Sequence, residues 1–332
     1  MNSTITRSRD FLDWLAVQLK TKDVYLLPMT GDASFRYYFR LPDFTGMIAV
    51  DSAPELANDN HGFVTVARLL KNVNLYVPEV YAHDLERGFL LISDLGHTVY
   101  LSALNDDTAD VLYGSALDSL AQLQTIEAID NFAKFDEQRM KEELENFRIW
   151  FIEKYLNCKL DPVWQKKLTH VFDVLVQSAV AQPQVFIHRD YHSRNLLVNE
   201  KNPGILDFQD AMLGPVTYDA VSLLRDAYIA WPSEKVSEWA SSFYQRIDDR
   251  HDFSRDHFTQ AFDFMGTQRH LKAIFIFARK YLRDDVDTYL ADIPRTLNYI
   301  RAVSAKYPSL KDLHELITVR LLPELNAKGL VP

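Results

Sequence analysis

The segment FIHRDYHSRNLLV, residues 186–198, and the shorter segment ILDFQ, residues 205–209, carry the strongest structural signal of this 332-residue chain. Apolar runs lie on both sides of the first segment and before the aspartate of the second, which predicts short buried strands around an exposed loop. Asp190 and Asn195 fall in that loop. Asp207 follows twelve residues after Asn195. A hairpin of this length, turning at residues 201–204, is expected to return the Asp207 carboxylate to the same edge of a cleft.

The spacing of His188, Asp190 and Asn195 matches the kinase catalytic loop, H-x-D-x-x-x-x-N. In that pattern the aspartate orients the acceptor hydroxyl or takes its proton, and the asparagine oxygen holds a metal ion without adding charge. Asp207 is the expected second ligand, and hard oxygen ligands favour Mg²⁺. The spacing alone would arise by chance in roughly one or two of a hundred such chains. The flanking strands and Asp207 therefore carry much of the argument for phosphoryl transfer.

Other charged residues near the loop have less certain roles. His188 directly follows a buried strand, so we expect its ring to anchor the loop backbone rather than to act as the base. His192 and Arg194 are candidates to neutralise the transferring phosphoryl group, with a solvated surface arginine equally open for Arg194. Asp219 begins a predicted helix, where it could hydrogen-bond the loop or simply favour the helix dipole.

Composition describes an ordinary globular protein. Apolar residues make up 47% and charged residues 25% of the chain, which is enough to bury a core. The net charge of −10 is spread along the sequence, which disfavours nucleic acid as a partner. Cys158 is the single cysteine, so no intrachain disulfide can form.

With no apolar leader at residues 1–10 and no membrane-length apolar run, we expect a cytoplasmic protein that does not bind membranes. The sequence identifies no protein partner.

Residues 1–92 are expected to form a small first lobe. Phe11, Trp14 and Leu19 fall at helical spacing, which predicts an amphipathic helix at the start. Residues 21–92 then indicate a small antiparallel sheet with one helix near residues 64–70. The expected strands lie at residues 24–27, 35–41, 47–50, 77–82 and 89–92.

The helical period dominates after residue 96. The expected helices lie at residues 107–123, 137–156, 162–180, 218–229, 233–247, 268–282 and 288–307. The break at residues 93–96 predicts a hinge between a first lobe at residues 1–92 and a second at 97–332. The fold class is therefore α+β, with a sheet-rich lobe and a larger, mainly helical lobe.

These motifs, with GPVTYD at residues 214–219, resemble the aminoglycoside phosphotransferase and choline kinase superfamily. The segments GDASFRYYFR (31–40), DFQDA (207–211) and DAVSLLRD (219–226) are similar to the bacterial anomeric sugar kinases. Those enzymes phosphorylate N-acetylmuramate and N-acetylglucosamine at the 1-hydroxyl in cell-wall recycling. The resemblance covers most of residues 20–310. It implies a bilobal protein-kinase-like fold, ATP and Mg²⁺ as cofactors, and a small amino-sugar acceptor.

The resemblance also implies roles for single residues. Asp190 would be the catalytic base, Asn195 and Asp207 the Mg²⁺ ligands, Ser34 a phosphate contact, and Ser93 and Leu95 the hinge residues whose main chain meets adenine. From the residues alone, the loop at 30–34 is equally well explained as a plain hairpin turn.

One position departs from the pattern. The strand IAV at residues 48–50 should end in the lysine that binds the α- and β-phosphates, and Asp51 stands there instead. The glutamate partner of that lysine is also missing, Glu55 being a weak candidate. The resemblance to the anomeric kinases implies the same absence, so another cation must serve. Arg36 or Arg40 is the hypothesis.

The acceptor is expected to bind near Gln209, Asp210, Arg225 and Asp226, whose side chains can hydrogen-bond sugar hydroxyls or a carboxylate. Each is equally plausible as a helix-surface or interlobe group. A kinase for an aminoglycoside, choline or homoserine is the alternative within the enzyme class. A pseudokinase scaffold is the alternative outside it, supported by Asp51 and opposed by the three oxygen ligands.

Overall fold

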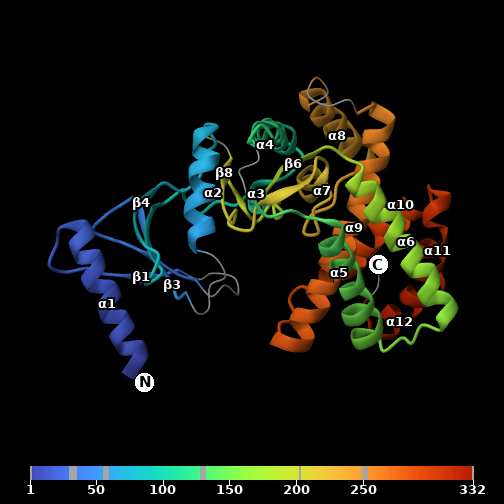
Figure 1. Cartoon of the computed structure of the whole chain (residues 1–332), viewed down its shortest axis with the longest axis horizontal. Coiled ribbons are helices and arrows are strands. Elements are labelled where there is room, and N and C mark those ends of the chain that lie inside the picture. The colour runs from blue at the N-terminus through green and yellow to red at the C-terminus, as the bar shows by residue number, and fades with distance from the viewer. Residues whose placement is uncertain are drawn as a thin grey trace. The chain divides into compact units, whose positions relative to one another are not determined.

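The computed structural model describes residues 2–29, 36–54, 60–127, 132–201, 203–247, 249 and 253–330, with side chains from residue 7 onward. Backbone contacts divide the chain into two units. The first comprises residues 1–103 together with 194–211, and the second comprises residues 104–193 together with 212–332. Each unit is described by itself below and can be followed by colour in Figure 1.

The first unit is built on a five-stranded antiparallel sheet in the order β1-β2-β3-β5-β4. Its strands are β1 (Leu27–Pro28), β2 (Arg36–Arg40), β3 (Met47–Ser52), β4 (Val80–Asp84) and β5 (Phe89–Ser93). Each expected strand overlaps an observed one, although the first does so only at Leu27 and the fourth begins three residues later than expected. The first strand is only two residues long and pairs Leu27 with Arg40 and Pro28 with Phe39.

Helix α1 (Asn2–Leu19) buries its apolar stripe on one face of this sheet. Phe11, Trp14 and Leu15 pack with Ala49 of β3 and Phe89 of β5 in one core cluster. The predicted amphipathic helix is therefore confirmed. Its aromatic residues, rather than strong helix propensity, hold it to the sheet.

The two faces of β3 have different partners because side chains alternate along a strand. Asp51 shares the α1 face with Ala49, and its carboxylate forms an ion pair with Arg7 of α1. Ser52 points to the opposite face, where its Oγ donates a 2.6 Å hydrogen bond to Oδ1 of Asn60. Asn60 begins α2 (Asn60–Asn72). The aspartate that replaces the expected lysine is thus paired with α1, on the face opposite α2.

The remaining elements of the first unit carry the predicted metal segment. Helix α3 spans Tyr100–Ala103, and the strands β7 (Leu196–Leu197) and β8 (Gly204–Ile205) form the expected hairpin. An isolated bridge pairs Val99 with Leu197, and another pairs Tyr76 with Gly204. These contacts place residues 194–211 in the first unit, although they follow the catalytic loop in sequence.

The second unit is mainly helical, with one two-stranded ladder of β6 (Gln184–Ile187) and β9 (Met212–Pro215). Its first helices are α4 (Ala109–Leu123), α5 (Glu137–Asn146), the π-helix η1 (Phe147–Tyr155), α6 (Pro162–Val180), α7 (Tyr218–Leu224) and α8 (Ser233–Ile247). Its later helices are α9 (Arg255–Asp284), η3 (Leu290–Asp292), α10 (Ile293–Ser304), η4 (Pro308–Leu310), α11 (Lys311–Leu316), η5 (Ile317–Leu321) and α12 (Leu322–Ala327).

Helix α9 is the central element of the second unit (Figure 1). It contacts α5, α6, α7, α10 and η1. The sequence predicted only residues 268–282, and the helix begins thirteen residues earlier. Ser254 caps it by accepting a hydrogen bond from the His257 N–H, and Phe258, Ala261 and Phe262 continue its buried stripe.

Helix α7 ends at Leu224, five residues earlier than expected. Asp226 explains the difference, because its carboxylate accepts the Tyr228 N–H in a local turn that competes with the helix. The expected helix at residues 137–156 changes to π-helical winding at Phe147.

The fold class is confirmed as α+β, with a sheet-rich first unit and a helical second one. Backbone contacts place the boundary between the two units after Ala103. The predicted lobe boundaries at residues 92 and 96 remain a prediction. Within the described ranges, none of the helices combines the length and apolar character needed to cross a bilayer.

Candidate active site

Strands β6 and β9 present the catalytic loop in the second unit. Phe186 and Ile187 are buried and pair with Leu213 and Met212, so β6 is fixed up to the residue before the loop. Arg189 then adopts φ of +77°, a left-handed conformation that is unusual for a residue with a side chain. Such strain persists only where surrounding contacts hold it, and it commonly marks functional sites.

Asp219, in the first turn of α7, supplies those contacts. Its fully buried carboxylate accepts the His188 N–H at 2.6 Å and the Arg189 N–H at 3.0 Å. Burial raises the pKa of Asp219 above its ordinary value, against the opposing effect of His188 and the two backbone donors. His188 in turn accepts the Asp190 N–H on Nδ1 at 3.3 Å. The prediction that His188 anchors the loop is confirmed, and so is the hydrogen bond from the loop to Asp219.

Asp190 lies between two cations of α9. Its Oδ1 is 3.8 Å from Nη1 of Arg269 and 3.9 Å from Nζ of Lys272, while its side chain keeps 35% of its surface exposed. Burial alone would raise the pKa of Asp190, but Lys272 and Arg269, with smaller contributions from His192 and Arg189, hold it well below its usual range. The carboxylate is therefore ionised wherever the protein is folded near neutral pH.

The two cations are themselves fixed. Arg269 donates to the Arg189 carbonyl at 2.6 Å and to the Tyr218 hydroxyl at 3.1 Å, and Lys272 donates to the same hydroxyl at 3.2 Å. Burial would lower the pKa of Lys272, but Tyr218, Asp190 and Glu143 raise it above its ordinary value. Both groups therefore stay charged beside Asp190.

The far end of the loop is held by Asp226. Its Oδ2 accepts the Ser193 N–H at 3.0 Å and also the Ser193 hydroxyl, and its Oδ1 accepts the Tyr228 N–H. Asp226 is 2% exposed. The loop from His188 to Ser193 is thus tied at both ends to carboxylates that follow β9.

A cavity of about 220 Å³ opens beside Asp190 in the second unit. Drug-sized pockets occupy about 300–1,000 Å³, so this cavity suits a smaller ligand. Its charged or polar lining comes from the loop, the end of α7 and the middle of α9: Asp190, His192, Ser222, Arg225, Asp226, Arg269, His270 and Lys272. Arginine and lysine outnumber aspartate among these residues. Arg225 is paired with Asp263, however, which leaves Arg269 and Lys272 against Asp190 and Asp226, so the charges of the lining are close to balanced.

Asn195 and Asp207 lie together in the first unit. Asn195 Nδ2 is 3.4 Å from Oδ2 of Asp207, and the Asn195 carbonyl accepts the Leu206 N–H at 2.9 Å. Asp207 has φ of +60°, a second left-handed residue at a predicted site position. Gln209 donates to Oδ1 of Asp207 at 2.7 Å. The predicted pairing of these two ligands is therefore observed, and their convergence with Asp190 on one nucleotide remains a prediction.

The oxygen atoms of Asn195 and Asp207 suit Mg²⁺ better than a metal ion that is held by three or more protein side chains. Within the described part of the chain, no group of three or more His, Cys, Asp or Glu side chains could hold a metal ion. Mg²⁺ needs no such group, because it usually keeps several waters and binds one or two protein oxygens together with substrate phosphates. One exposed carboxylate beside one amide is such a set.

Arg36 and Arg40 are placed differently on β2. Arg36 donates from Nε to Ser52 Oγ at 3.2 Å, and its guanidinium lies 5.6 Å from the centre of the Phe63 ring of α2. Arg40 forms an ion pair with Asp94 at the predicted hinge. Ser34 and Glu55 lie outside the described residues.

The predicted hinge is a fixed turn after β5. The Ser93 N–H donates to the Glu79 carbonyl at 2.9 Å, and Leu95 is buried. Asp94 accepts the Gly96 N–H at 2.8 Å, and Gly96 has φ of +100°, which a side chain would oppose.

The four predicted acceptor residues divide between the units. Gln209 and Asp210 belong to the first, where Gln209 contacts Asp207 and Asp210 is exposed. Arg225 and Asp226 line the cavity of the second. The carboxylate of Asp226 is occupied by Ser193 and Tyr228, so its evident role is to position the loop.

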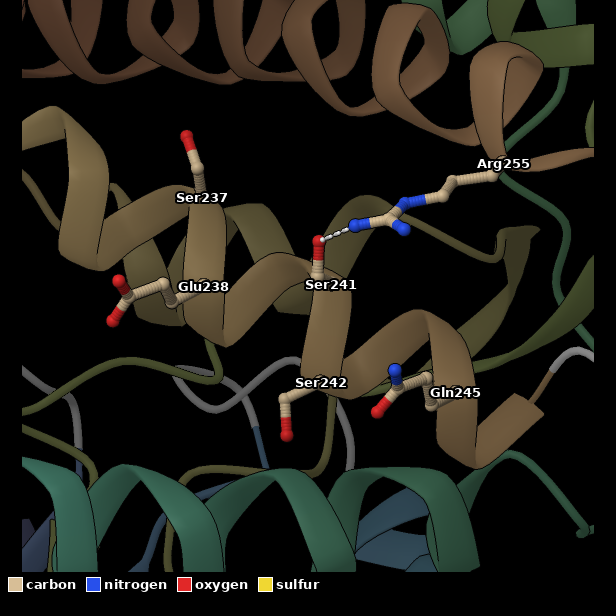
Figure 2. A pocket seen from close by; sticks show the side chains of 6 residues that line it. All are labelled: Ser237, Glu238, Ser241, Ser242, Gln245 and Arg255. Carbon is tan, nitrogen blue, oxygen red and sulfur yellow. Dashed lines mark hydrogen bonds between the residues drawn. The ribbon is translucent and has the colours of Figure 1, made fainter.

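A second cavity, of about 410 Å³, lies on α8 and contains none of these residues. Figure 2 shows Arg255 reaching from the start of α9 to donate to Ser241 of α8, at 2.8 Å. The lining of this second cavity includes no residue of the catalytic loop, so this cavity is not the reaction site.

Sequence reasoning missed Arg269, Lys272 and Ser222 as site residues. Arg269 and Lys272 lie on α9, far along the chain from the loop, and no local motif marks them, whereas Ser222 lies within the segment DAVSLLRD (219–226) quoted for the resemblance. A usable signal was the presence of Arg269 and Lys272 in an otherwise apolar helical stretch, since charged residues are rarely buried without a partner.

Comparison with known proteins agrees with this geometry. The chain is 41% identical over 297 residues to the N-acetylmuramate/N-acetylglucosamine kinase of Pseudomonas aeruginosa, covering 88% of this chain and 87% of that one. It is 35% identical over 314 residues to the protein of the same name from Neisseria meningitidis, covering 92% and 93%.

Solved structures share the fold at low identity. The aminoglycoside phosphotransferase APH(2'')-Ib with bound ADP matches with a TM-score of 0.61 and 16% identity, over 87% of this chain and 97% of that one. A choline/ethanolamine kinase family protein from Mesorhizobium loti matches with a TM-score of 0.64 and 14% identity, over 95% and 99%.

The family model described as the phosphotransferase enzyme family matches residues 26–253, which include β1 to β9 and the whole catalytic loop. The resemblance to aminoglycoside phosphotransferases and choline kinases is thereby confirmed, and the chain belongs to the phosphotransferase enzyme family.

Proposed function

We propose that this protein is an ATP-dependent kinase that phosphorylates the anomeric 1-hydroxyl of N-acetylmuramate and N-acetylglucosamine, in cell-wall sugar recycling in the cytoplasm. The observation that carries the proposal is Asp190, fixed by an anchored loop at the edge of a small polar cavity. The identity of the acceptor is inferred from the names of two relatives that are 35–41% identical to this chain.

Asp190 would align the acceptor hydroxyl. The O1 oxygen attacks the γ-phosphorus, its proton passes to the Asp190 carboxylate, and ADP leaves in line with the attack. A carboxylate with a depressed pKa is a weak base. It suits a loose transition state, in which orientation matters more than early proton removal.

Asn195 and Asp207 would hold Mg²⁺ through one amide and one carboxylate oxygen. An ion held by these two residues would supply positive charge against the negative charge that develops on the phosphates. The amide of Asn195 must turn so that its oxygen, rather than Nδ2, faces the ion, because only the oxygen can be a ligand.

Arg36 is the proposed substitute for the missing lysine, in preference to Arg40. The guanidinium of Arg40 is already paired with Asp94. Arg36 is oriented by Ser52, which Asn60 fixes through a second hydrogen bond from Nδ2 to the Ser52 carbonyl at 2.9 Å. Arg36 also affects the pKa of Tyr38 together with Asp207, so it lies within electrostatic range of the proposed metal site.

The other nucleotide contacts follow from the family resemblance. Ser34 would bind a phosphate, Ser93 and Leu95 would meet adenine through their main chain, and His192 would face the transferred group. His192 lines the cavity with Asp190 and packs edge-on to Tyr228.

The acceptor would occupy the 220 Å³ cavity, with Arg225 as its main contact among the four predicted residues. The pseudokinase alternative rests on Asp51 alone, whose carboxylate pairs with Arg7 of α1.

A panel of acceptors with radiolabelled ATP tests the proposal. We expect transfer to N-acetylmuramate and N-acetylglucosamine that requires Mg²⁺ and disappears in Asp190→Asn. Transfer to aminoglycosides, choline or homoserine but not to N-acetyl sugars would overturn the acceptor. Nucleotide consumption unaffected by Asp190→Asn would overturn the role of Asp190.

A further inference from the structure

Glu143 is a largely buried carboxylate on α5. Met140 and Leu144, three residues before it and one residue after it, are 0% and 1% exposed, so Glu143 lies at the edge of the buried side of this helix. Its side chain keeps 16% of its surface exposed. A carboxylate is rarely buried to this degree without a cationic partner, because burial removes the water that stabilises its charge. Two cations of the site lie beside it.

The first cation, Arg189, ties Glu143 to the catalytic loop. Its Nη2 donates to Oε1 of Glu143 at 3.1 Å. Arg189 is also the residue with φ of +77°, a conformation that glycine adopts without strain and that arginine disfavours. Such strain indicates that the arginine side chain is needed at this position. Its contact with Glu143 links α5 to the residue that directly precedes Asp190.

The second cation, Lys272, lies between two carboxylates. Its Nζ is 3.9 Å from Oε1 of Glu143 and 3.9 Å from Oδ1 of Asp190, and both distances are too long for a hydrogen bond. Equal distances make the attractions of the two carboxylates comparable in strength. The ammonium donates instead to the Tyr218 hydroxyl at 3.2 Å. Lys272 is therefore held at an intermediate position rather than directly on either carboxylate.

The charge of Glu143 maintains this position. Within the described residues, Oε2 of Glu143 has no hydrogen-bond partner, so the charge of this carboxylate acts on Arg189 and Lys272. Without that charge, the attraction of Asp190 for Lys272 would be unopposed. The flexible lysine stem could then bring its ammonium to about 2.8 Å from Oδ1 of Asp190, the usual length of a charge-assisted hydrogen bond. A direct ion pair of this kind would compete with the acceptor hydroxyl for the carboxylate.

We propose that Glu143 is a positioning residue, which keeps the ammonium of Lys272 from pairing directly with Asp190. Lys272 then acts on Asp190 from a distance, and the loop rather than the lysine orients the carboxylate. This inference rests on the proposed function, because it takes Asp190 as the group that aligns the acceptor hydroxyl. It adds α5 to the helices that control the catalytic loop.

Glu143→Gln isolates the charge of this residue. Glutamine has the same shape, and its carbonyl oxygen can still accept from Arg189, so the fold should persist. At pH 8, kcat/KM for N-acetylglucosamine should fall about 10- to 100-fold, the factor that corresponds to breaking a charge-assisted hydrogen bond before transfer. KM for ATP should not change. Glu142→Gln is the matched control, because Glu142 is exposed and accepts from Gln138 at 2.9 Å, and it should leave kcat/KM unchanged.

Lys272→Met shows whether Glu143 acts through the lysine. Without Lys272, no ammonium can move onto Asp190, so adding Glu143→Gln to Lys272→Met should change kcat/KM at pH 8 by less than about 2-fold. If Glu143 only holds Arg189 in place, Glu143→Gln should cause the same loss with and without Lys272→Met. That result would overturn the inference, and so would an unchanged kcat/KM in Glu143→Gln alone.

A crystal structure of Glu143→Gln separates this inference from the proposed function. We expect Nζ of Lys272 to lie within about 3.0 Å of Oδ1 of Asp190 in the variant. This shorter distance, together with a wild type that phosphorylates neither N-acetyl sugar, would sustain positioning by Glu143 and overturn the proposed acceptor. Phosphorylation of the sugars by the wild type, with the distance unchanged at 3.9 Å in the variant, would do the reverse.

Discussion

The ammonium nitrogen of Lys272 lies 3.9 Å from Oδ1 of Asp190, and Arg269, one turn earlier on α9, lies 3.8 Å from the same oxygen. The central helix of the second unit therefore sets the protonation state of the catalytic loop. A base flanked by two fixed cations stays ionised and oriented, and a mechanism that depends on positioning requires both properties.

Lys272→Met should move the acid limb of activity to higher pH. The Lys272 charge holds the pKa of Asp190 down, so its removal raises that pKa and protonates the base at a pH where the wild type is still ionised. The pH profile of kcat/KM for N-acetylglucosamine measures this shift. Lys280→Met, on the same helix but facing Tyr289, is the control and should leave the profile in place. An unchanged acid limb in Lys272→Met would show that Asp190 is not governed by this cation.

Asp219→Asn should loosen the loop. An asparagine offers one acceptor oxygen and turns N–H donors toward the backbone N–H groups of His188 and Arg189, so the free energy of unfolding should fall by about 1.5–3 kcal/mol. We expect kcat to fall at least 10-fold with little change in KM for ATP. Urea denaturation and steady-state kinetics check the two effects. Asp118→Asn, whose exposed carboxylate pairs with Arg246, should change stability by less than about 0.5 kcal/mol. Equal effects at both positions would contradict the anchoring role.

Asp207→Asn should weaken the binding of Mg²⁺. Asparagine tolerates the left-handed backbone at this position, so the fold should persist while the ligand loses its charge. The Mg²⁺ concentration for half-maximal activity should rise at least 10-fold, as measured by Mg²⁺ titration of ADP release. Glu200→Gln, an exposed carboxylate near the β7–β8 turn, should have no effect. A wild-type Mg²⁺ dependence in Asp207→Asn would remove Asp207 from the metal site.

Arg36→Ala should weaken nucleotide binding. A charge-assisted contact to phosphate is worth about 1.5–3 kcal/mol, which corresponds to a rise in Kd of about 10-fold or more. Calorimetric titration with ADP and Mg²⁺ measures it. Arg40→Ala, which breaks the ion pair with Asp94, should have a smaller effect. Unchanged affinity in both variants would mean that neither arginine replaces the lysine.

His270 should make the protein sensitive to acid. Burial, aided by the Arg225 and Arg269 charges, lowers the pKa of His270 to about 3, whereas an unfolded histidine titrates near 6.5. The unfolded state therefore binds more protons between these values, so stability falls as pH drops from about 6.5 toward 3, by up to about 1.4 kcal/mol per pH unit. His270→Gln should flatten this slope in urea denaturation at pH 7, 6 and 5. An unchanged slope would show that His270 is not the titrating group.

The sequence predicted the elements whose signals are local. The apolar runs on both sides of Asp190 and the apolar run at residues 47–50 are readable from the sequence alone, and strands β6, β7 and β3 lie at these runs. The sequence did not predict the start of α9 at Arg255. Its cap, Ser254, is a single residue and therefore a weak signal compared with the long buried stripe that follows. The early end of α7 depended on an Asp226 side chain that hydrogen-bonds the backbone, which no periodicity reports.

The candidate site divides in the same way. Asp190, Asn195 and Asp207 lie in motifs with fixed spacing, so their roles could be hypothesised from the sequence. Arg269 and Ser222 come near Asp190 only because α7 and α9 pack together, and contacts of that kind are set by tertiary structure rather than by spacing. The pairing of Asp51 with Arg7 was equally hidden, since forty-four residues separate them.

The phosphorus NMR spectrum of the product formed from N-acetylmuramate and ATP tests the central claim most directly. A phosphate on O1 is coupled to the single anomeric proton, so the account predicts a doublet in the proton-coupled spectrum. A phosphate on O6 is coupled to two protons and gives a triplet-like signal, which would contradict transfer to the 1-hydroxyl.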